Sequence, residues 1–256
     1  MDSNEIFENK VISPGSSKWD ELPSEMKLKL VNQYGMYNID AVASIQRWHL
    51  WHMCTARFYG LKSKCLSHKI GAVIVRDKTV LATGYNGPPR GVAECHTQAR
   101  LEHVISNHLD PKDIDAISHL TAHWGEGCPR RILGFRSGEG LHLCPAGHAE
   151  SNSIANAARE GVRVSGADMY TYPLMPCMFC AKQIIGAGIA RVFHVKGDDY
   201  DKEARWMMEQ AGIKLIGVPK EMIGNLWNTL LHSKTECGSC MAHQCSSKSS
   251  NQTSEE

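Results

Sequence analysis

Three side chains that bind zinc well stand near a carboxylate in two short segments of this 256-residue chain. His148 and Glu150 are two positions apart, and Cys177 and Cys180 follow Pro176. One imidazole and two thiolates would give Zn²⁺ three ligands and leave the fourth tetrahedral position open for water. Zinc lowers the pKa of such a water from about 15.7 to about 7. We therefore predict a catalytic metal centre, with Glu150 facing the water without binding the metal.

Each half of this pattern is ambiguous by itself. A C-x-x-C pair also occurs in redox proteins and in half of a structural zinc site, and H-x-E alone carries little information. A structural zinc site normally closes with a fourth protein ligand and needs no glutamate at this place. The order H-x-E followed by P-C-x-x-C is the signature of zinc-dependent deaminases. It favours Glu150 as the group that moves protons between water, a pyrimidine nitrogen and departing ammonia.

The elements that must position these residues alternate between β-branched runs and helical segments. Strands are expected at residues 70–75, 80–85, 167–172, 191–195 and 214–218, the first two paired as a hairpin. Helices are expected at residues 40–60, 148–159, 177–187, 200–211 and 219–231. This alternation predicts a layered α/β fold. Both ligand sets would then lie at helix starts, where the partial positive charge favours thiolates.

The chain is expected to contain one domain over residues 39–232, preceded by an N-terminal extension over 1–38 with one short helix near 22–34. Residues 233–256 are rich in Ser, Gln and Asn and are expected to be a disordered tail. The tail contains a Cys and His cluster that we interpret as flexible thiols rather than a metal site. Its members are Cys237, Cys240, His243 and Cys245.

Residues 87–142 form a Cys- and His-rich insertion with one expected helix near 97–108. A structureless segment of this length is unusual in a compact domain, and a second metal would tie it down. The cysteines available for a four-thiolate or Cys/His site are Cys65, Cys95, Cys128 and Cys144. His68, His96 and His142 compete for a place among the ligands. The alternative is a group of free buried thiols.

Composition restricts the class of partner and the compartment. A net charge of +1 and an isoelectric point near 7.6 give no basic surface of the kind that nucleic acids require. No apolar run reaches the length of a membrane span, and the acidic, polar N-terminus does not resemble a signal peptide. Ten cysteines without a secretory signal indicate thiols and metal ligands in a reducing compartment. We expect a small-molecule substrate and a location in the cytoplasm, or in the host cytoplasm if the protein is viral.

Residues from about 44 to 218 resemble the deoxycytidylate deaminases, within the cytidine deaminase-like superfamily. The resemblance is carried by residues 67–75, 84–87 (Gly-Tyr-Asn-Gly), 148–154 and 176–182, together with Gly188-Ile189. The motif at 84–87 separates deoxycytidylate deaminases from the free cytidine deaminases and tRNA adenosine deaminases that share the zinc signature. The resemblance implies a three-layer α/β/α sandwich with a mixed five-stranded sheet. It also implies zinc-dependent hydrolysis of dCMP to dUMP, which supplies the precursor of thymidylate.

The resemblance assigns further roles position by position. It implies that Asn86 binds the deoxyribose or shapes the pocket, and that Asn152 helps to hold the sugar. Arg159 stands where phage members place an arginine on the 5′-phosphate, although a solvated charge at a helix end would look the same. Tyr200 matches a tyrosine that lines the nucleotide site, with plain packing as the alternative. Ser153 replaces the alanine that is usual in the family.

Regulation and assembly are also implied by the resemblance. Many members are activated by dCTP and inhibited by dTTP, and Gly84, Tyr85 and Gly87 would contribute to that effector site. Members are often hexamers, so a homo-oligomer is expected, with the hexamer favoured. Phage members also carry a structural zinc that uses cysteines matching Cys65 and Cys95, which adds to the argument for a second zinc.

Three other functions fit parts of the pattern. A related enzyme would also accept dCTP or a 5-modified dCMP, such as a 5-methyl form. Another would deaminate a base in tRNA or single-stranded nucleic acid, which the near-neutral charge and the 84–87 motif disfavour. The third is a zinc-stabilised nucleotide-binding regulator without turnover, and Glu150 argues against it because a binder needs no proton carrier.

Overall fold

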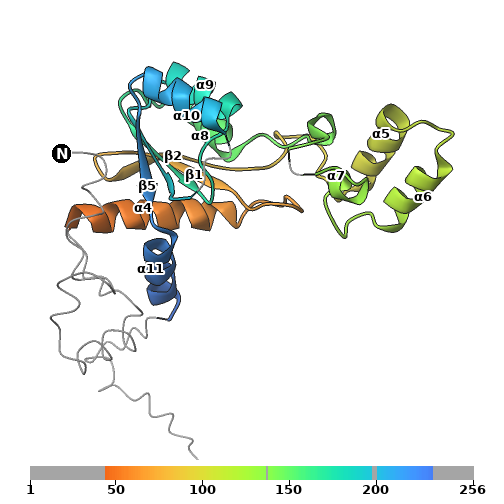
Figure 1. Ribbon diagram of the computed structural model, residues 1–256, viewed down its shortest axis with the longest axis horizontal. Helices are drawn as coiled ribbons and strands as arrows, with labels where there is room; N and C mark the ends of the chain where they lie inside the picture. Colours follow the sequence, from red (N-terminus) through yellow and green to blue (C-terminus); the bar gives the residue numbers. More distant parts are fainter. Residues whose placement is uncertain (1–43, 137, 198–200, 233–256) are drawn as a thin grey trace, which may run out of the picture.

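A mixed five-stranded sheet lies at the centre of the computed structural model, which describes residues 44–136, 138–197 and 201–232 (Figure 1). The strand order is β2-β1-β3-β4-β5. The antiparallel part pairs β1 (Gly71–Arg76) with β2 (Thr79–Tyr85) and with β3 (Asp168–Tyr172). The parallel part joins β3 to β4 (Arg191–Val195) and β4 to β5 (Lys214–Val218). All five predicted strands and the predicted hairpin are confirmed.

Helices cover both faces of the sheet, so the predicted three-layer sandwich is confirmed (Figure 1). One face carries α4 (Ser44–Gly60) and α11 (Lys220–His232). The other face carries α8 (Ala149–Arg159), α9 (Met178–Gly186) and α10 (Lys202–Gln210). Each face has its own apolar core, because alternate strand residues point to opposite layers. Thus Val73 and Val75 pack under α4, whereas Ile74 packs under α8 and α9.

Two glycines, one for each face of the sheet, allow a helix backbone to lie directly against a strand. A Cβ atom at Gly71 would lie 1.9 Å from the carbonyl oxygen of Ala56 in α4. A Cβ atom at Gly84 would lie 2.1 Å from the carbonyl oxygen of Ala149 and 2.5 Å from the nitrogen of Ser153 in α8. No side chain fits at these separations, so glycine is required for α4 and α8 to pack this closely.

The insertion contains more helix than the sequence predicted. The expected helix is present as α5 (Gln98–His108), but α6 (Ile114–Ala122), α7 (Pro129–Ile132) and the 3₁₀ turn η2 (Leu141–Leu143) were missed. These elements lie to one side of the sandwich (Figure 1) and enclose a small apolar cluster of their own. The buried members of this cluster are Leu101, Val104, Leu120 and Leu143. The missed helices are only one to three turns long, and they are stabilised by packing on one another rather than by a long periodic pattern.

Some predictions fall on residues that the structure does not describe. The N-terminal extension with its helix near 22–34, the C-terminal tail and the tail cluster at residues 237–245 lie outside the described ranges. Within those ranges, none of the helices is both long enough and apolar enough to cross a membrane.

A buried histidine joins α4 to the sheet. The Nδ1 atom of His49 lies 2.7 Å from the hydroxyl of Tyr170, and the His49 ring stacks on Phe193 with 4.3 Å between centroids. Burial, together with the nearby Arg191 and His52, lowers the pKa of His49 to about 4. His49 is therefore neutral in the folded protein at neutral pH.

This pKa predicts acid-sensitive stability. Unfolded chains bind a proton at a histidine near pH 6.5, whereas folded His49 does so only near pH 4. The unfolded state therefore binds more protons between these values, and His49 makes the free energy of unfolding fall as the pH falls, by at most about 1.4 kcal/mol per unit. Urea unfolding at pH 7, 6 and 5 should show a shallower decline for His49→Phe than for the parent. Metal release at low pH affects both proteins and cancels in the comparison. Parallel declines would contradict a neutral buried His49.

Candidate metal centre

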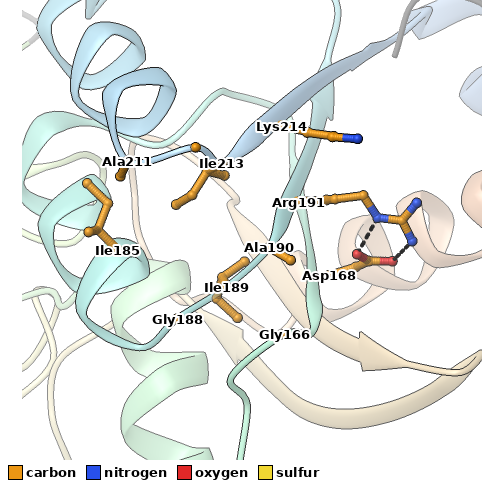
Figure 2. A pocket seen from close by; sticks show the side chains of 11 residues that line it. Gly166, Asp168, Ile185, Gly188, Ile189, Ala190, Arg191, Ala211, Ile213 and Lys214 are labelled. Carbon is orange, nitrogen blue, oxygen red and sulfur yellow. Dashed lines mark hydrogen bonds and ion pairs between the residues drawn. The ribbon is translucent and has the colours of Figure 1, made fainter. Parts of the chain in front are cut away.

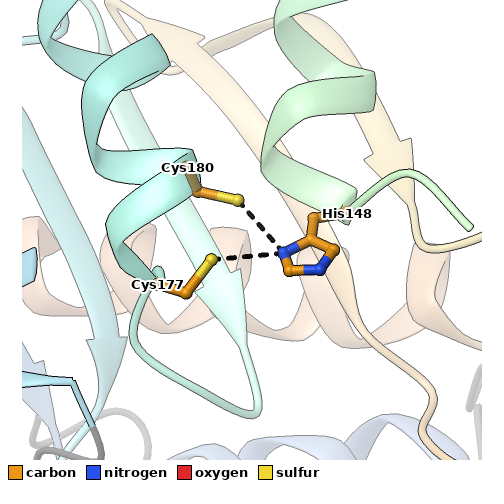
Figure 3. Close-up of side chains that lie close together, drawn as sticks. All are labelled: His148, Cys177 and Cys180. Carbon is orange, nitrogen blue, oxygen red and sulfur yellow. Dashed lines mark hydrogen bonds between the residues drawn. The ribbon is translucent and has the colours of Figure 1, made fainter. Parts of the chain in front are cut away.

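The starts of α8 and α9 bring the three predicted metal ligands together (Figure 3). His148 is the N-cap residue of α8, and Cys177 is the N-cap residue of α9. The Nδ1 atom of His148 lies 3.3 Å from the sulfur of Cys177 and 3.3 Å from the sulfur of Cys180. Tetrahedral zinc with Zn–S near 2.3 Å and Zn–N near 2.0 Å would separate such atoms by roughly 3.5 Å. The donor types and their spacing therefore fit zinc.

Helix N-termini and hydrogen bonds favour the thiolate form at this site. The pKa of Cys177 is lowered, first by its hydrogen bond with the Cys180 thiol and also by His148. The hydroxyl of Ser151, in the first turn of α8, lies 3.6 Å from the sulfur of Cys180. The two cysteines are buried, whereas His148 is exposed. The site is thus closed on the sulfur side and open on the histidine side.

Glu150 lies in the first turn of α8 and is only 4% exposed. Burial raises the pKa of its carboxyl group, and His148 and a hydrogen bond from Cys180 act in the opposite direction. These interactions place the carboxylate beside the ligand set. A buried carboxyl group that can hold or release a proton near the metal position is what acid–base chemistry at this site requires.

Asp201 is a site residue that the sequence analysis missed. One of its carboxylate oxygens accepts a hydrogen bond of 2.7 Å from the backbone N–H of Met178, the first residue of α9. The other oxygen accepts one of 2.9 Å from Ala204 and caps α10. The capping of α10 could have been predicted, because an aspartate directly precedes the helix. The contact with Met178 could not have been predicted, because it depends on how the separate helices α9 and α10 pack on each other. Asp201 fixes the turn that carries Cys177 and Cys180.

The two asparagines expected at the sugar bind the backbone instead. The buried side chain of Asn86 accepts a hydrogen bond from the N–H of Ile70 and donates one to the carbonyl of His68, both 2.9 Å long. The amide of Asn152 donates to the carbonyl of Tyr85 at 2.8 Å and to that of Gly147 at 3.4 Å. The Asn86 side chain thus holds the backbone of residues 68 and 70, and the Asn152 side chain holds that of residues 85 and 147, while the expected roles of both at the nucleotide stay predictions.

The remaining expected nucleotide contacts are not gathered at the metal ligands. Arg159 lies at the far end of α8, about 15 Å along the helix from its first residue. Its guanidinium contacts the carboxylate of Glu160 at 2.9 Å and the side chain of Asn156 at 3.0 Å. Tyr200 lies outside the described residues. Of the residues expected at an effector site, Gly84 packs under α8, Tyr85 is exposed, and Gly87 pairs with Gly147.

The cysteines expected at a second metal converge without forming a tight ligand set. Within the described ranges, His148, Cys177 and Cys180 form the one group whose ligand atoms lie within 4.8 Å of each other. The pKa of Cys95 is nevertheless raised to about 11, first by burial and then by the thiols of Cys144, Cys128 and Cys65. A 2.9 Å ion pair between Lys64 and Glu94 also joins the neighbours of Cys65 and Cys95. The four thiols therefore lie in one region.

A surface cavity lies away from the candidate metal ligands, at the amino ends of the parallel strands (Figure 2). It has a volume of about 520 Å³, and its walls include Asp168 at the start of β3 and Arg191 at the start of β4. These two side chains form a double hydrogen bond with both distances at 2.6 Å. None of the 11 lining residues is a histidine or a cysteine. The cavity therefore offers no His or Cys ligand for zinc, and the candidate metal site lies at the opposite ends of these strands.

Comparison with known proteins identifies the family. Residues 46–196 match the family model described as the "Cytidine and deoxycytidylate deaminase zinc-binding region". The chain belongs to this deaminase family. His148, Cys177 and Cys180, which form a group that could hold a metal ion, all lie within the matched range, and together with the family model they support zinc as the metal.

Individual relatives of this deaminase include phage, bacterial, yeast and mammalian proteins. It is 34% identical over 165 residues to the deoxycytidylate deaminase of Enterobacteria phage T2, covering 62% of this chain and 86% of the relative. It is 31% identical over 182 residues to ComE operon protein 2 of Bacillus subtilis, covering 71% and 77%. A solved structure of the cyanophage S-TIM5 dCMP deaminase with dCMP and dUMP is 20% identical, with a TM-score of 0.45 over 69% of this chain and 98% of that one.

Removing Asp201 should weaken the zinc site of this deaminase without touching a ligand. Asp201→Ala leaves the N–H groups of Met178 and Ala204 without their acceptors. Loss of such a cap costs about 1–2 kcal/mol, and we expect lower stability and faster zinc release to a chelator. Asp201→Asn keeps one acceptor and should lie between the two. Glu203→Ala, an exposed acidic residue of the same helix, controls for charge. Equal zinc release from Asp201→Ala and Glu203→Ala would refute the positioning role.

Proposed function

We propose that this protein catalyses the hydrolytic deamination of dCMP to dUMP, with His148, Cys177 and Cys180 as zinc ligands and Glu150 as the proton carrier. The observation that carries the proposal is the ligand set at two helix starts with a buried carboxylate beside it. Relatives in phages T2 and T4, 34% and 33% identical, bear the name deoxycytidylate deaminase. Both relatives are covered over most of their own length, at 86% and 89%.

The chemistry is a substitution at C4 of the pyrimidine. When bound, zinc supplies an activated water molecule as the nucleophile. Glu150 takes a proton from the water as the C4–O bond forms and delivers it to ring nitrogen N3. A second proton then passes through Glu150 to the amino group, the C4–N bond breaks, and ammonia leaves. Water and dCMP are thereby converted to dUMP and ammonia. Burial of Glu150 keeps these proton transfers away from bulk solvent.

Other substrates and functions remain distinguishable by product analysis. The alternatives are deamination of dCTP or a 5-modified dCMP, deamination of a nucleic acid base, and nucleotide binding without turnover. The purified protein is incubated separately with CMP, dCMP, dCTP, 5-methyl-dCMP and an oligodeoxynucleotide, and ammonia and product mass are measured. We expect dCMP to be the best substrate. Turnover of the oligonucleotide alone, or none with zinc bound, would reject the proposal.

Glu150→Gln is the sharpest test of the proton carrier. The amide is similar in shape, so zinc content and fold should be retained. It cannot accept the proton, and turnover should fall by about 10²–10⁴-fold or more. Glu160→Gln is the matched control, because Glu160 is exposed just past the end of the same helix. Zinc analysis and initial rates with dCMP check both variants. Near-parental turnover of Glu150→Gln would show that another group carries the proton.

The finer expectations about nucleotides and assembly are part of the proposal. We infer a homo-oligomer, with a hexamer favoured, and regulation by dCTP and dTTP through residues 84–87. Tyr85 is 41% exposed and so is available to a ligand. Arg159 is proposed as the contact of the 5′-phosphate, and its side chain is 44% exposed at the end of α8. The sugar roles of Asn152 and Asn86 would be indirect, through the loops that these residues hold.

We also propose a second, structural zinc held by four of the five other cysteines of the described residues. The ligands would be Cys65, Cys95, Cys128 and Cys144. Four thiols are a common structural zinc set. Their mutual effect on the pKa of Cys95 supports the proposal, because thiols that repel one another as thiolates need a cation to ionise together. Cys65 lies beyond α4, whereas the other three lie in or beside the insertion, so the metal would join the two parts.

Metal stoichiometry tests the second site. We expect two zinc ions per chain in the purified protein and one in a Cys95→Ser, Cys144→Ser double variant, with the remaining ion still at His148. Cys54→Ala is the control, because Cys54 is a buried cysteine between α4 and α11 whose thiol contacts the carbonyl of Ile223. Elemental analysis with protein quantification measures the ratio. A single zinc in the parent protein would overturn the second site while leaving the catalytic site intact.

A further inference from the structure

Two arginines are buried in the insertion without an anionic partner among the described residues. Arg100 is 8% exposed and Arg130 is 9% exposed. Each donates one side-chain hydrogen bond to a backbone carbonyl, Arg100 to Leu143 at 2.7 Å and Arg130 to Glu139 at 2.6 Å. The Nε atoms of both are buried with no hydrogen-bond partner. In the described part of the chain, neither guanidinium forms an ion pair with a carboxylate. Burying a cation without a counter-charge is costly.

Both arginines lie close in the sequence, or through a hydrogen bond, to three of the four cysteines, namely Cys95, Cys128 and Cys144. Arg100, in the first turn of α5, donates to the residue directly before Cys144 and acts electrostatically on the thiol of Cys95. Arg130 lies in α7, the short helix whose N-cap residue is Cys128. The positive charges are therefore buried beside the site at which the sequence places thiols.

Charge balance shows what these arginines can do. Four thiolates around one Zn²⁺ carry a formal charge of about −2. Two guanidinium groups neutralise that charge, and a protein interior tolerates a buried ion when its counter-charge is also buried. Four neutral thiols, in contrast, leave both cations uncompensated. The two states of the cysteine site thus differ in whether the buried arginines are stabilised.

We propose that Arg100 and Arg130 are the buried counter-charges of the four-thiolate zinc site, and that they make the fold of the insertion dependent on the metal. The inference rests on the second zinc proposed above. It assigns the two arginines as positioning and charge-compensating residues that do not touch the metal. A neutral side chain of similar length should therefore weaken zinc binding at the four cysteines and leave the catalytic zinc unchanged.

The first experiment compares Arg100→Met and Arg130→Met with Arg131→Met in the full-length protein. Arg131 is the matched control, because it is adjacent to Arg130 but exposed. Zinc transfer to a coloured chelator is followed, and alkylation of each cysteine is mapped by mass spectrometry. Loss of an outer-shell partner typically weakens metal binding by about 10–100-fold, and we expect that loss in the two buried variants. Arg100→Lys retains the charge and should lie closer to the parent.

A second measurement separates charge compensation from a purely structural role of the hydrogen bond that Arg100 donates to Leu143. Arg100→Met is also made in the Cys95→Ser, Cys144→Ser background, and opening of the insertion is followed by hydrogen exchange. With zinc bound, the substitution should increase exchange of α5 and η2. Without the metal site, it removes an uncompensated buried cation and should decrease exchange. If the hydrogen bond to Leu143 has a purely structural role, Arg100→Met would increase exchange in both backgrounds.

The outcomes distinguish the two proposals. One zinc per chain in the parent protein overturns the second zinc and the arginine role together. Two zinc ions in the parent, with equal release from Arg100→Met and Arg131→Met, overturn the arginine role alone. An increase in exchange in both backgrounds also overturns it, because the sign reversal is what a counter-charge requires.

Discussion

The contact between α8 and β2 at Gly84 is the constraint on which the zinc centre depends. The backbone of α8 lies so close to this strand that any Cβ atom at Gly84 would overlap the carbonyl of Ala149. Because His148 and Glu150 flank Ala149, the contact fixes the height and direction of both side chains over the sheet. The part of the centre that carries Cys177 and Cys180 is fixed by the hydrogen bond that the backbone N–H of Met178 donates to Asp201. Metal sites tolerate errors of only about 0.2 Å in ligand distance, so contacts that fix the backbone at both helix starts suit this purpose.

The segment from Gly84 to Gly87 therefore has a packing function before any function in binding. Gly84 admits α8, and the amide of Asn86 is used fully on the backbone of residues 68 and 70. Asn152, from α8, donates to the carbonyl of Tyr85 and joins the segment to the zinc helix. A loop whose polar groups are already paired needs little rearrangement when a ligand arrives, which lowers the entropic cost of binding. The same pairing leaves the exposed side chain of Tyr85 as the part of the motif that can face outward.

The sequence was most informative where a pattern is local. The grouping of His148, Cys177 and Cys180 and the five strands could be predicted, because ligand spacing and β-branched runs are properties of short segments. The helices α6 and α7 were missed because they are short and depend on the cluster around Leu120 and Leu143. Asp201 and Arg100 were missed because their partners, Met178 and Leu143, are 23 and 43 residues away. The structure places Arg159 at the opposite end of α8 from Glu150, and its expected role at a phosphate stays a prediction.

The two proposed zinc positions impose different demands on the chain. The catalytic ligands project from α8 and α9, which are already held by the apolar core around Ile184 and Met169. The four other cysteines project mainly from loops of the insertion, whose own core is small and whose buried cations lack carboxylate partners in the described residues. A metal therefore adds little to the fold at the first position and much at the second. Because Cys144 is only four residues before His148, loosening of the insertion would be transmitted through residues 145–147 to the start of α8. The insertion is thus connected to the chemistry by a short covalent link as well as by the hydrogen bonds between Gly87 and Gly147.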